Sequence, residues 1–254
     1  GAGANLGTAF VARSAPDGQT ILLVTTAIAI SPSVYANTGY DALKDLAPVI
    51  LVSTIPNVLV VNPSVPARNI GEFIAYAKAH HGKLNCAAPG ASSGQRMTFE
   101  MIKQVTGTDI VMVPYGGGAP ALQAVLGGQV EAMIVNVVEA ATYVHAGKLR
   151  ALATTTAQRA PMLPDVPTLA ETVAPKLDTS VWQGIVVPAA TPPAIVAQIN
   201  RDVAAALALP DVAERLGGLG MSVVPGTPEA FGRYIRDEID TWRKVAAAAG
   251  VKPE

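Results

Sequence analysis

Apolar residues along this chain alternate between short continuous runs and stretches with helical spacing. Short apolar runs, typical of buried strands, occupy residues 20–26, 84–88, 110–113, 130–135 and 149–155. Between them apolar residues recur every three or four positions, and glycines at 127–128 and 147 are stops expected at helix C-termini. This alternation indicates βαβ units, and therefore an α/β fold with mainly parallel sheets and flanking helices.

A different pattern begins after residue 160. The proline-rich stretch 161–175 predicts a surface connection, neither helix nor central strand. A strand is expected at 181–187 and a helix from 191 to 207. The last helix should open with Thr227 as N-cap and Pro228 in its first turn. Its apolar stripe, which predicts a face docked on a sheet, comprises Phe231, Ile235, Ile239, Trp242 and Val245.

The turn at residues 90–94 follows a predicted strand and precedes a helical pattern. Ser92 and Gln95 stand in the S-x-x-Q relation of a capping box, so Ser92 is predicted to be the N-cap. Backbone N–H groups, the hydroxyls of Ser92 and Ser93, and the positive end of the helix dipole would then meet at one point. The turn is therefore either a site for a carboxylate or phosphate, or a cap and nothing more.

Two further turns have the same candidate role. Residues 111–124 again run strand, glycine-rich turn and helix, and Gly116–Gly118 could bring more N–H groups beside the first turn if the strands are neighbours. The alternative is that glycine serves the turn geometry alone. Asn136 closes the strand at 130–135, where its amide could bind a ligand or cap the next helix.

Composition narrows the class of partner. The 254 residues carry a formal net charge of −1 and only 15% charged residues, so no basic surface for nucleic acid is expected. Cys86 is the single cysteine, which excludes an internal disulfide and a cysteine-rich zinc site. We expect no cofactor and no metal. No leader and no initial Met are visible, which indicates a processed or shortened start.

An enzymatic alternative rests on the same turn. Residues 90–94 match G-x-S-x-G, the nucleophile elbow of serine hydrolases, with Ser92 as nucleophile. His145 is the sole downstream histidine and would have to be the base. It stands at a predicted helix end, and no HGGG-type oxyanion segment is present.

Six motifs in a fixed order point to a family. They are APDGQTILL at 15–23, PNVLVVNP at 56–63, VPYGGGAPAL at 113–122, LGGQV at 126–130, AGKLRALA at 146–153 and PDVPTLAE at 164–171. In these the chain resembles the tripartite tricarboxylate transporter receptors, the Bug family of periplasmic solute-binding proteins. The resemblance covers essentially the whole chain. It implies a two-lobed type II periplasmic binding protein, or Venus flytrap, with residues 1–55 and 181–254 in one lobe and 56–180 in the other.

The resemblance also implies a ligand and its contacts. Family ligands are carboxylates held by one strand-to-helix loop from each lobe, and the matching residues here are Thr25, Thr26, Ala27, Ala91, Ser92, Ser93, Gly94 and Gln95. A second charged group on the ligand would have to meet Tyr115, Asn136, Trp182, Gln183 or the missing opening segment. Trp182 could form a wall of the cleft, although a core position is the commoner case for tryptophan. We expect a di- or tricarboxylate, an aromatic carboxylate or an acidic amino acid.

The implied setting is a periplasmic monomer that binds without catalysis and works with membrane transporter subunits. One departure from the family concerns the start of the chain. Family members open with a strand, a glycine-rich loop and a helix before the segment that begins here at Gly1. That opening contributes a sheet strand and one of the carboxylate-gripping loops. Without it, weak binding or none is expected of the chain as given; the alternative is that the segment has been omitted.

Overall fold

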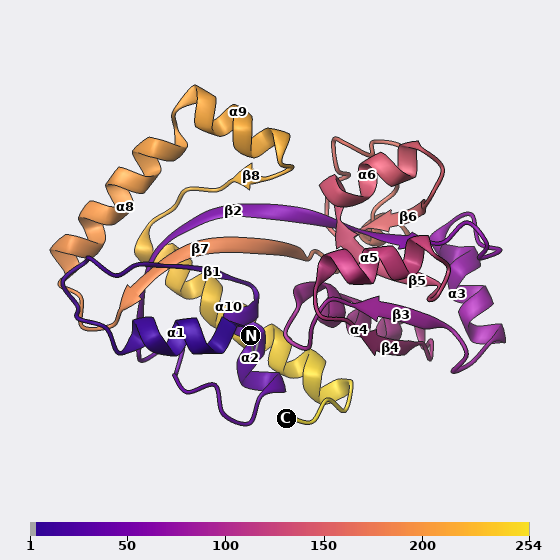
Figure 1. Cartoon of the computed structure of the whole chain (residues 1–254), viewed down its shortest axis with the longest axis horizontal. Helices are drawn as coiled ribbons and strands as arrows, with labels where there is room; N and C mark the ends of the chain where they lie inside the picture. The colour runs from indigo at the N-terminus through magenta and orange to yellow at the C-terminus, as the bar shows by residue number, and fades with distance from the viewer. Residues whose placement is uncertain (1–3, 254) are drawn as a thin grey trace. The chain divides into compact units, whose positions relative to one another are not determined.

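A computed structural model describes residues 4–253; residues 1–3, on which the expectation of a processed start rests, and residue 254 lie outside the described part. The chain divides into two compact units. The first contains the residues up to Thr54 and those from Trp182 onward, and the second contains Ile55–Val181. Strands β2 (Leu46–Val61) and β7 (Ser180–Pro188) each cross a boundary between the units (Figure 1).

The sheet of the first unit has the order β1-β7-β2-β8. β1 (Leu22–Thr25) pairs antiparallel with β7, from Leu22 opposite Val186 to Thr25 opposite Gln183. β8 (Ser222–Val223) pairs antiparallel with β2. β1 is thus an edge strand, and the side chain of Leu23 on it is exposed.

Five helices flank this sheet in the described part of the first unit: α1 (Asn5–Ala12), α2 (Ala27–Val34), α8 (Pro193–Leu207), α9 (Pro210–Gly218) and α10 (Pro228–Ala248). The prediction for α10 is confirmed, since Thr227 accepts a hydrogen bond from the Ala230 N–H and Pro228 is its first residue. Its predicted apolar stripe is buried. α10 packs along α2 (Figure 1).

The sheet of the second unit is mixed. Its strands are β3 (Asn85–Ala88), β4 (Val111–Pro114), β5 (Ala132–Asn136) and β6 (Arg150–Thr154), in the order β6-β2-β5-β3-β4. β3 runs parallel to β4 and β5, whereas β2 is antiparallel to both β5 and β6. The α/β class is confirmed. The expectation of mainly parallel sheets holds for this sheet, in which only β2 runs against the other strands, but is wrong for the first unit, where β1 with β7 and β2 with β8 pair antiparallel. β2 enters from the first unit and separates two strands that run the opposite way.

Helices cover both faces of this sheet: α3 (Ile70–Ala79), α4 (Gly94–Thr106), α5 (Gly118–Leu126), α6 (Val137–His145) and α7 (Leu169–Thr172). Alternate residues of β2 belong to different cores. Leu59 packs in a cluster with Phe73 and Phe99 of α3 and α4, whereas Val58 packs with Leu122 and other residues of α5 and α6. Burial on both faces explains the continuous apolar runs in the sequence.

Two predictions of local structure require correction. The stretch 161–175 does contain a helix, α7, because Thr168 and Glu171 form a capping box just after Pro167. The sixteen-residue strand β2 was not predicted, because Pro48 and Pro56 lie within it and proline normally argues against a central strand.

Candidate ligand-binding site

Three strand-to-helix turns meet at one edge of the sheet in the second unit. β3 is parallel to both β4 and β5, so Ala88, Pro114 and Asn136 end their strands at the same edge. Each strand is followed by a helix, beginning at Gly94, Gly118 and Val137 respectively. The strands before the turns at 90–94 and 116–118 are neighbours, which meets the condition for these two turns to adjoin. Open α/β sheets bind ligands at this edge.

The first turn is closed by its own residues. Gly90 has φ of 151°, a conformation that disfavours any side chain. Ser93, not Ser92, is the N-cap: its hydroxyl oxygen accepts from the Arg96 N–H at 3.2 Å and donates to the Gly90 carbonyl at 2.9 Å. The predicted capping box is wrong because the helix starts at Gly94, which moves the N-cap to Ser93 and puts Arg96, not a Glu or Gln, at the third helical position. Ser92 is instead buried, with 4% of its surface exposed.

Arg96 places a positive charge at this turn. Its Nη1 donates to the Ala91 carbonyl at 3.0 Å, so the guanidinium folds back over the residues that precede the helix. This contact holds the positive charge of the guanidinium beside the turn. A positive charge in this place favours an anionic ligand.

The predicted site residues Gln95 and Asn136 are brought together. Gln95 Nε2 donates to Asn136 Oδ1 at 3.4 Å, and Asn136 Nδ2 donates to Glu139 Oε1 at 3.1 Å. Asn136 occupies the N-cap position of α6 without a side-chain cap bond, so the simple capping alternative is wrong. Tyr115 lies at the same edge, where its N–H donates to the Ala88 carbonyl at 2.8 Å.

A comparable turn lies in the first unit, where β1 ends at Thr25 and α2 begins at Ala27. Thr26 is 1% exposed and forms no side-chain cap. Its hydroxyl oxygen instead accepts from the backbone N–H of Trp182 at 3.1 Å, and the Ala27 N–H donates to Thr25 Oγ1 at 3.3 Å. This turn is therefore held by a residue far away in sequence.

Trp182 belongs to the core of the first unit. Its indole is fully buried, and its ring makes edge contacts with Phe231 and Tyr234 at centroid distances of 5.7 and 5.6 Å. Its Nε1 donates to Glu238 Oε2 at 2.7 Å. The interpretation of the Trp182 ring as a wall of the ligand site is therefore wrong. Burial raises the pKa of the Glu238 carboxyl; no sequence pattern marked this residue.

The geometry opposes the hydrolase alternative. His145 is the last residue of α6 and is exposed. With a rise of about 1.5 Å per residue, α6 carries it roughly 12 Å from the edge where the three turns meet. Ser92 lies at that edge and His145 does not. Among residues 4–253 no group of three or more His, Cys, Asp or Glu side chains is placed to hold a metal ion.

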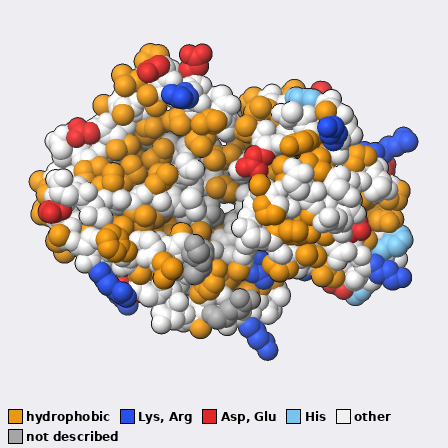
Figure 2. Space-filling model, in the orientation of Figure 1, with side chains coloured by type: hydrophobic (Ala, Val, Ile, Leu, Met, Phe, Trp, Pro, Cys, Tyr) orange, Lys and Arg blue, Asp and Glu red, His pale blue; other side chains and the backbone are white. Residues whose placement is uncertain are grey.

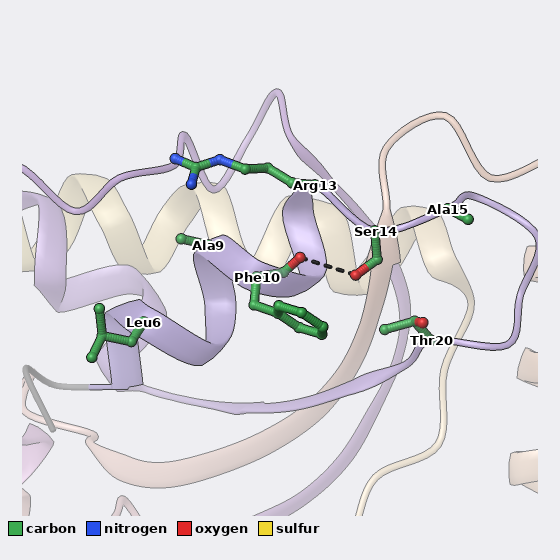
Figure 3. Close-up of a pocket in the computed structure, with 7 residues that line it drawn as sticks. All are labelled: Leu6, Ala9, Phe10, Arg13, Ser14, Ala15 and Thr20. Carbon is green, nitrogen blue, oxygen red and sulfur yellow. Dashed lines mark hydrogen bonds between the residues drawn. The ribbon is translucent and has the colours of Figure 1, made fainter.

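A separate cavity of about 550 Å³ lies in the first unit (Figure 3). Its lining residues are Leu6, Ala9, Phe10, Arg13, Ser14, Ala15 and Thr20. Arg13 donates to the Gly39 carbonyl and Ser14 to the Phe10 carbonyl, so these two polar side chains of the lining are engaged. None of the predicted site residues lines this cavity.

The visible face of the molecule agrees with the low charge of the sequence. Figure 2 shows charged side chains at scattered points among broad hydrophobic areas, without a continuous basic patch. Within residues 4–253, no helix combines the length and hydropathy required to cross a membrane.

Comparison with known proteins gives a consistent result. A family model described as "Tripartite tricarboxylate transporter family receptor" matches residues 1–251. The protein BugT of Bordetella pertussis is 35% identical over 254 residues, which cover 99% of this chain and 78% of BugT.

Two solved structures extend this comparison to the fold. Rpa4515 of R. palustris, solved with adipate, is 34% identical with a TM-score of 0.89, over 98% of this chain and 84% of that one. MatC from Rhodopseudomonas palustris, solved with bound malate, is 32% identical with a TM-score of 0.86, over 97% and 85%.

Proposed function

Because the chain belongs to the tripartite tricarboxylate transporter receptor family, which includes the Bug proteins, we propose that it captures a small organic carboxylate for a transporter of this type. The observation that carries the proposal is the meeting of three strand-to-helix turns at one sheet edge of the second unit. The first turns of α4 and α5 contain no acidic residue. The adipate and malate held by the two similar proteins support this ligand class.

Receptors of this family bind solutes and are not enzymes, so the serine-hydrolase alternative is wrong. The fold is accordingly the two-lobed α/β fold of periplasmic binding proteins. The family places the chain outside the cytoplasm. The finer location in the periplasm, a monomeric state and contacts with the membrane subunits are part of our proposal.

In the second unit we assign the carboxylate to the N-terminal turn of α4. The first N–H groups of a helix lack intrahelical acceptors, which leaves those of Gly94 and Gln95 for the ligand. The Ser93 hydroxyl already donates to Gly90, so Ser93 would act by holding the turn in shape. The other contacts proposed in this unit are Ala91, Ser92, Tyr115 and Asn136.

In the first unit we assign the ligand to Thr25, Thr26 and Ala27. Because Thr26 Oγ1 accepts from the Trp182 N–H, its own O–H remains to donate to an anion. We propose that the two units act as the two lobes of this fold and that each contributes one turn to the ligand. A ligand that touches both would shift the population toward a closed form.

Calorimetry and thermal shift with adipate, malate and glutamate test the proposal, with adipamide as the uncharged control for adipate. Binding of at least one acid but not the diamide is expected. An acid at about 100 times its Kd should stabilise the folded protein by about 2.7 kcal/mol. Small-angle scattering should report compaction with the same acid. Failure of every carboxylate to bind, or ester turnover abolished by Ser92→Ala without unfolding, would contradict it.

A further inference from the structure

Both tryptophans of this chain donate to one carboxylate. Glu238 Oε2 accepts from Trp182 Nε1 at 2.7 Å and from Trp242 Nε1 at 3.0 Å, and the sequence contains no other tryptophan. Glu238 and Trp242 lie one turn apart on α10, whereas Trp182 is on β7. A half-buried carboxylate that accepts two N–H groups is a strong tie between the helix and the strand.

The backbone of Trp182 links this tie to the proposed ligand site. Its N–H donates to Thr26 Oγ1 at 3.1 Å, across 156 positions of sequence. Next to it, Gln183 pairs with Thr25 in the ladder between β7 and β1. The turn from Thr25 to Ala27 is therefore attached to β7 at two successive residues, and α10 holds β7 through the indole.

We propose that Glu238 is a positioning residue for ligand binding: by fixing Trp182, it holds the turn Thr25–Ala27 in the geometry that receives the carboxylate. A turn that is already ordered before the ligand arrives does not lose conformational entropy on binding, so the affinity is higher than for a turn that the ligand must order. The predicted effect on affinity rests on the proposed function. The effect of Glu238 on the order of the turn Thr25–Ala27 does not, because it concerns the first unit alone and can be measured without ligand.

Three variants separate positioning from simple packing. Glu238→Gln keeps an oxygen that can accept both indole N–H groups. Glu238→Leu removes the acceptor and puts an apolar side chain of similar size in its place. Trp242→Phe is the matched control, because it removes one donor and leaves the bond between Trp182 and Glu238. It also leaves Trp182 as the sole tryptophan, so emission then reports that indole.

Hydrogen exchange without ligand is the first measurement. Amides of β1, of the first turn of α2 and of Trp182 should exchange about tenfold faster in Glu238→Leu, as expected for loss of a hydrogen bond to a charged group. Glu238→Gln and Trp242→Phe should stay within about twofold of the wild type. On the Trp242→Phe background, Glu238→Leu should shift the emission of Trp182.

Adipate affinity is the second measurement. Glu238→Leu should weaken it about tenfold and Glu238→Gln by less than about twofold. Equal effects of the Leu and Gln variants, or a loss of stability in the Leu variant with unchanged exchange and affinity, would overturn the inference. If the Leu variant does not fold, Trp182→Phe replaces it, since it removes the indole N–H and keeps a ring; it should raise exchange at Thr26 and Ala27. If the wild type binds no carboxylate, the proposed function fails while the exchange comparison still decides the positioning role.

Discussion

The two turns assigned to the ligand are built in opposite ways. In the second unit, the turn before α4 is closed by contacts no more than five residues apart: Ser93 to Gly90, Arg96 to Ser93, and Arg96 to Ala91. In the first unit, the turn before α2 has no side-chain cap, and Thr26 is held by Trp182 from 156 positions away. One turn should therefore respond to changes in its own sequence, the other to changes in a distant core.

The largest effect is expected from Gly184→Ala, which should disturb the core that supports the turn Thr25–Ala27 in the first unit. A Cβ at Gly184 would overlap ring carbon Cζ of Phe231 and lie 2.9 Å from the Ile50 carbonyl oxygen. Phe231 packs edge-on against Trp182, so its displacement should disturb the hold on Thr26. We expect a loss of about 3 kcal/mol in the free energy of unfolding, measured by urea denaturation.

Gly217→Ala is the matched control, since no atom lies within 4 Å of a Cβ built at this position in α9. It should be neutral, or stabilising by up to about 1 kcal/mol. Equal stability of the Gly184→Ala and Gly217→Ala variants would show that Phe231 moves aside without cost. The core that supports the turn Thr25–Ala27 would then not be tightly fixed.

Gly90→Ala tests whether the turn at 90–94 in the second unit is held by its own residues. A Cβ at Gly90 would meet no atom within 4 Å, so the cost would come from the backbone, whose φ is 151°. We expect about 2 kcal/mol of destabilisation and a clear loss of adipate affinity. Gly218→Ala in α9, also without neighbours within 4 Å and without a positive φ but outside the proposed site, should neither destabilise the protein nor weaken adipate binding. A Gly90→Ala variant that binds adipate normally would remove this turn from the site.

The same contrast explains how far the sequence could predict the fold. The strand–helix pairs β3-α4, β4-α5 and β5-α6 were predicted because in each a short apolar run is followed directly by helical spacing of apolar residues. β2 was missed because its pairing depends on four strands distant in sequence, β5, β6, β7 and β8, and because Pro48 and Pro56 lie within it. Its insertion between β5 and β6 also makes the sheet mixed, and no local pattern encodes that order.

The candidate site divides in the same way. The turn at 90–94 was predicted from its residues, although its cap was assigned to Ser92 in place of Ser93. For Trp182 a core position was the commoner expectation and a cleft wall the alternative. The sequence could not decide between them, because the burial depends on Phe231, Tyr234 and Glu238 of α10.

Ser93→Ala should have a smaller effect than the two glycine variants. Loss of the N-cap should cost about 1 kcal/mol of stability. Asn69→Ala removes an equivalent cap from α3, where Asn69 accepts from the Glu72 N–H at 2.9 Å, and should cost the same. Only Ser93→Ala should also weaken adipate binding, about fivefold, because the turn it closes is the proposed contact. Equal affinities of the two variants, measured by calorimetry, would assign Ser93 to helix stability alone.

The smallest effect is expected from charge, in which the two turns also differ. The first turn of α2 carries no acidic residue, whereas Glu139 in the first turn of α6 accepts from Asn136 at the edge where the second-unit turns meet. Its exposed carboxylate should repel an anionic ligand weakly, so Glu139→Gln should tighten adipate binding by about two- to threefold at low salt. The gain should vanish near 1 M salt, where the screening length falls to about 3 Å. Glu229→Gln, an exposed first-turn acid of α10, controls for net charge and should leave the affinity unchanged. Weaker binding by Glu139→Gln would instead mean that the Glu139 carboxylate orients the Asn136 amide toward the ligand. The site in the second unit would then depend on side-chain contacts outside the turn at 90–94, as the turn Thr25–Ala27 depends on Trp182.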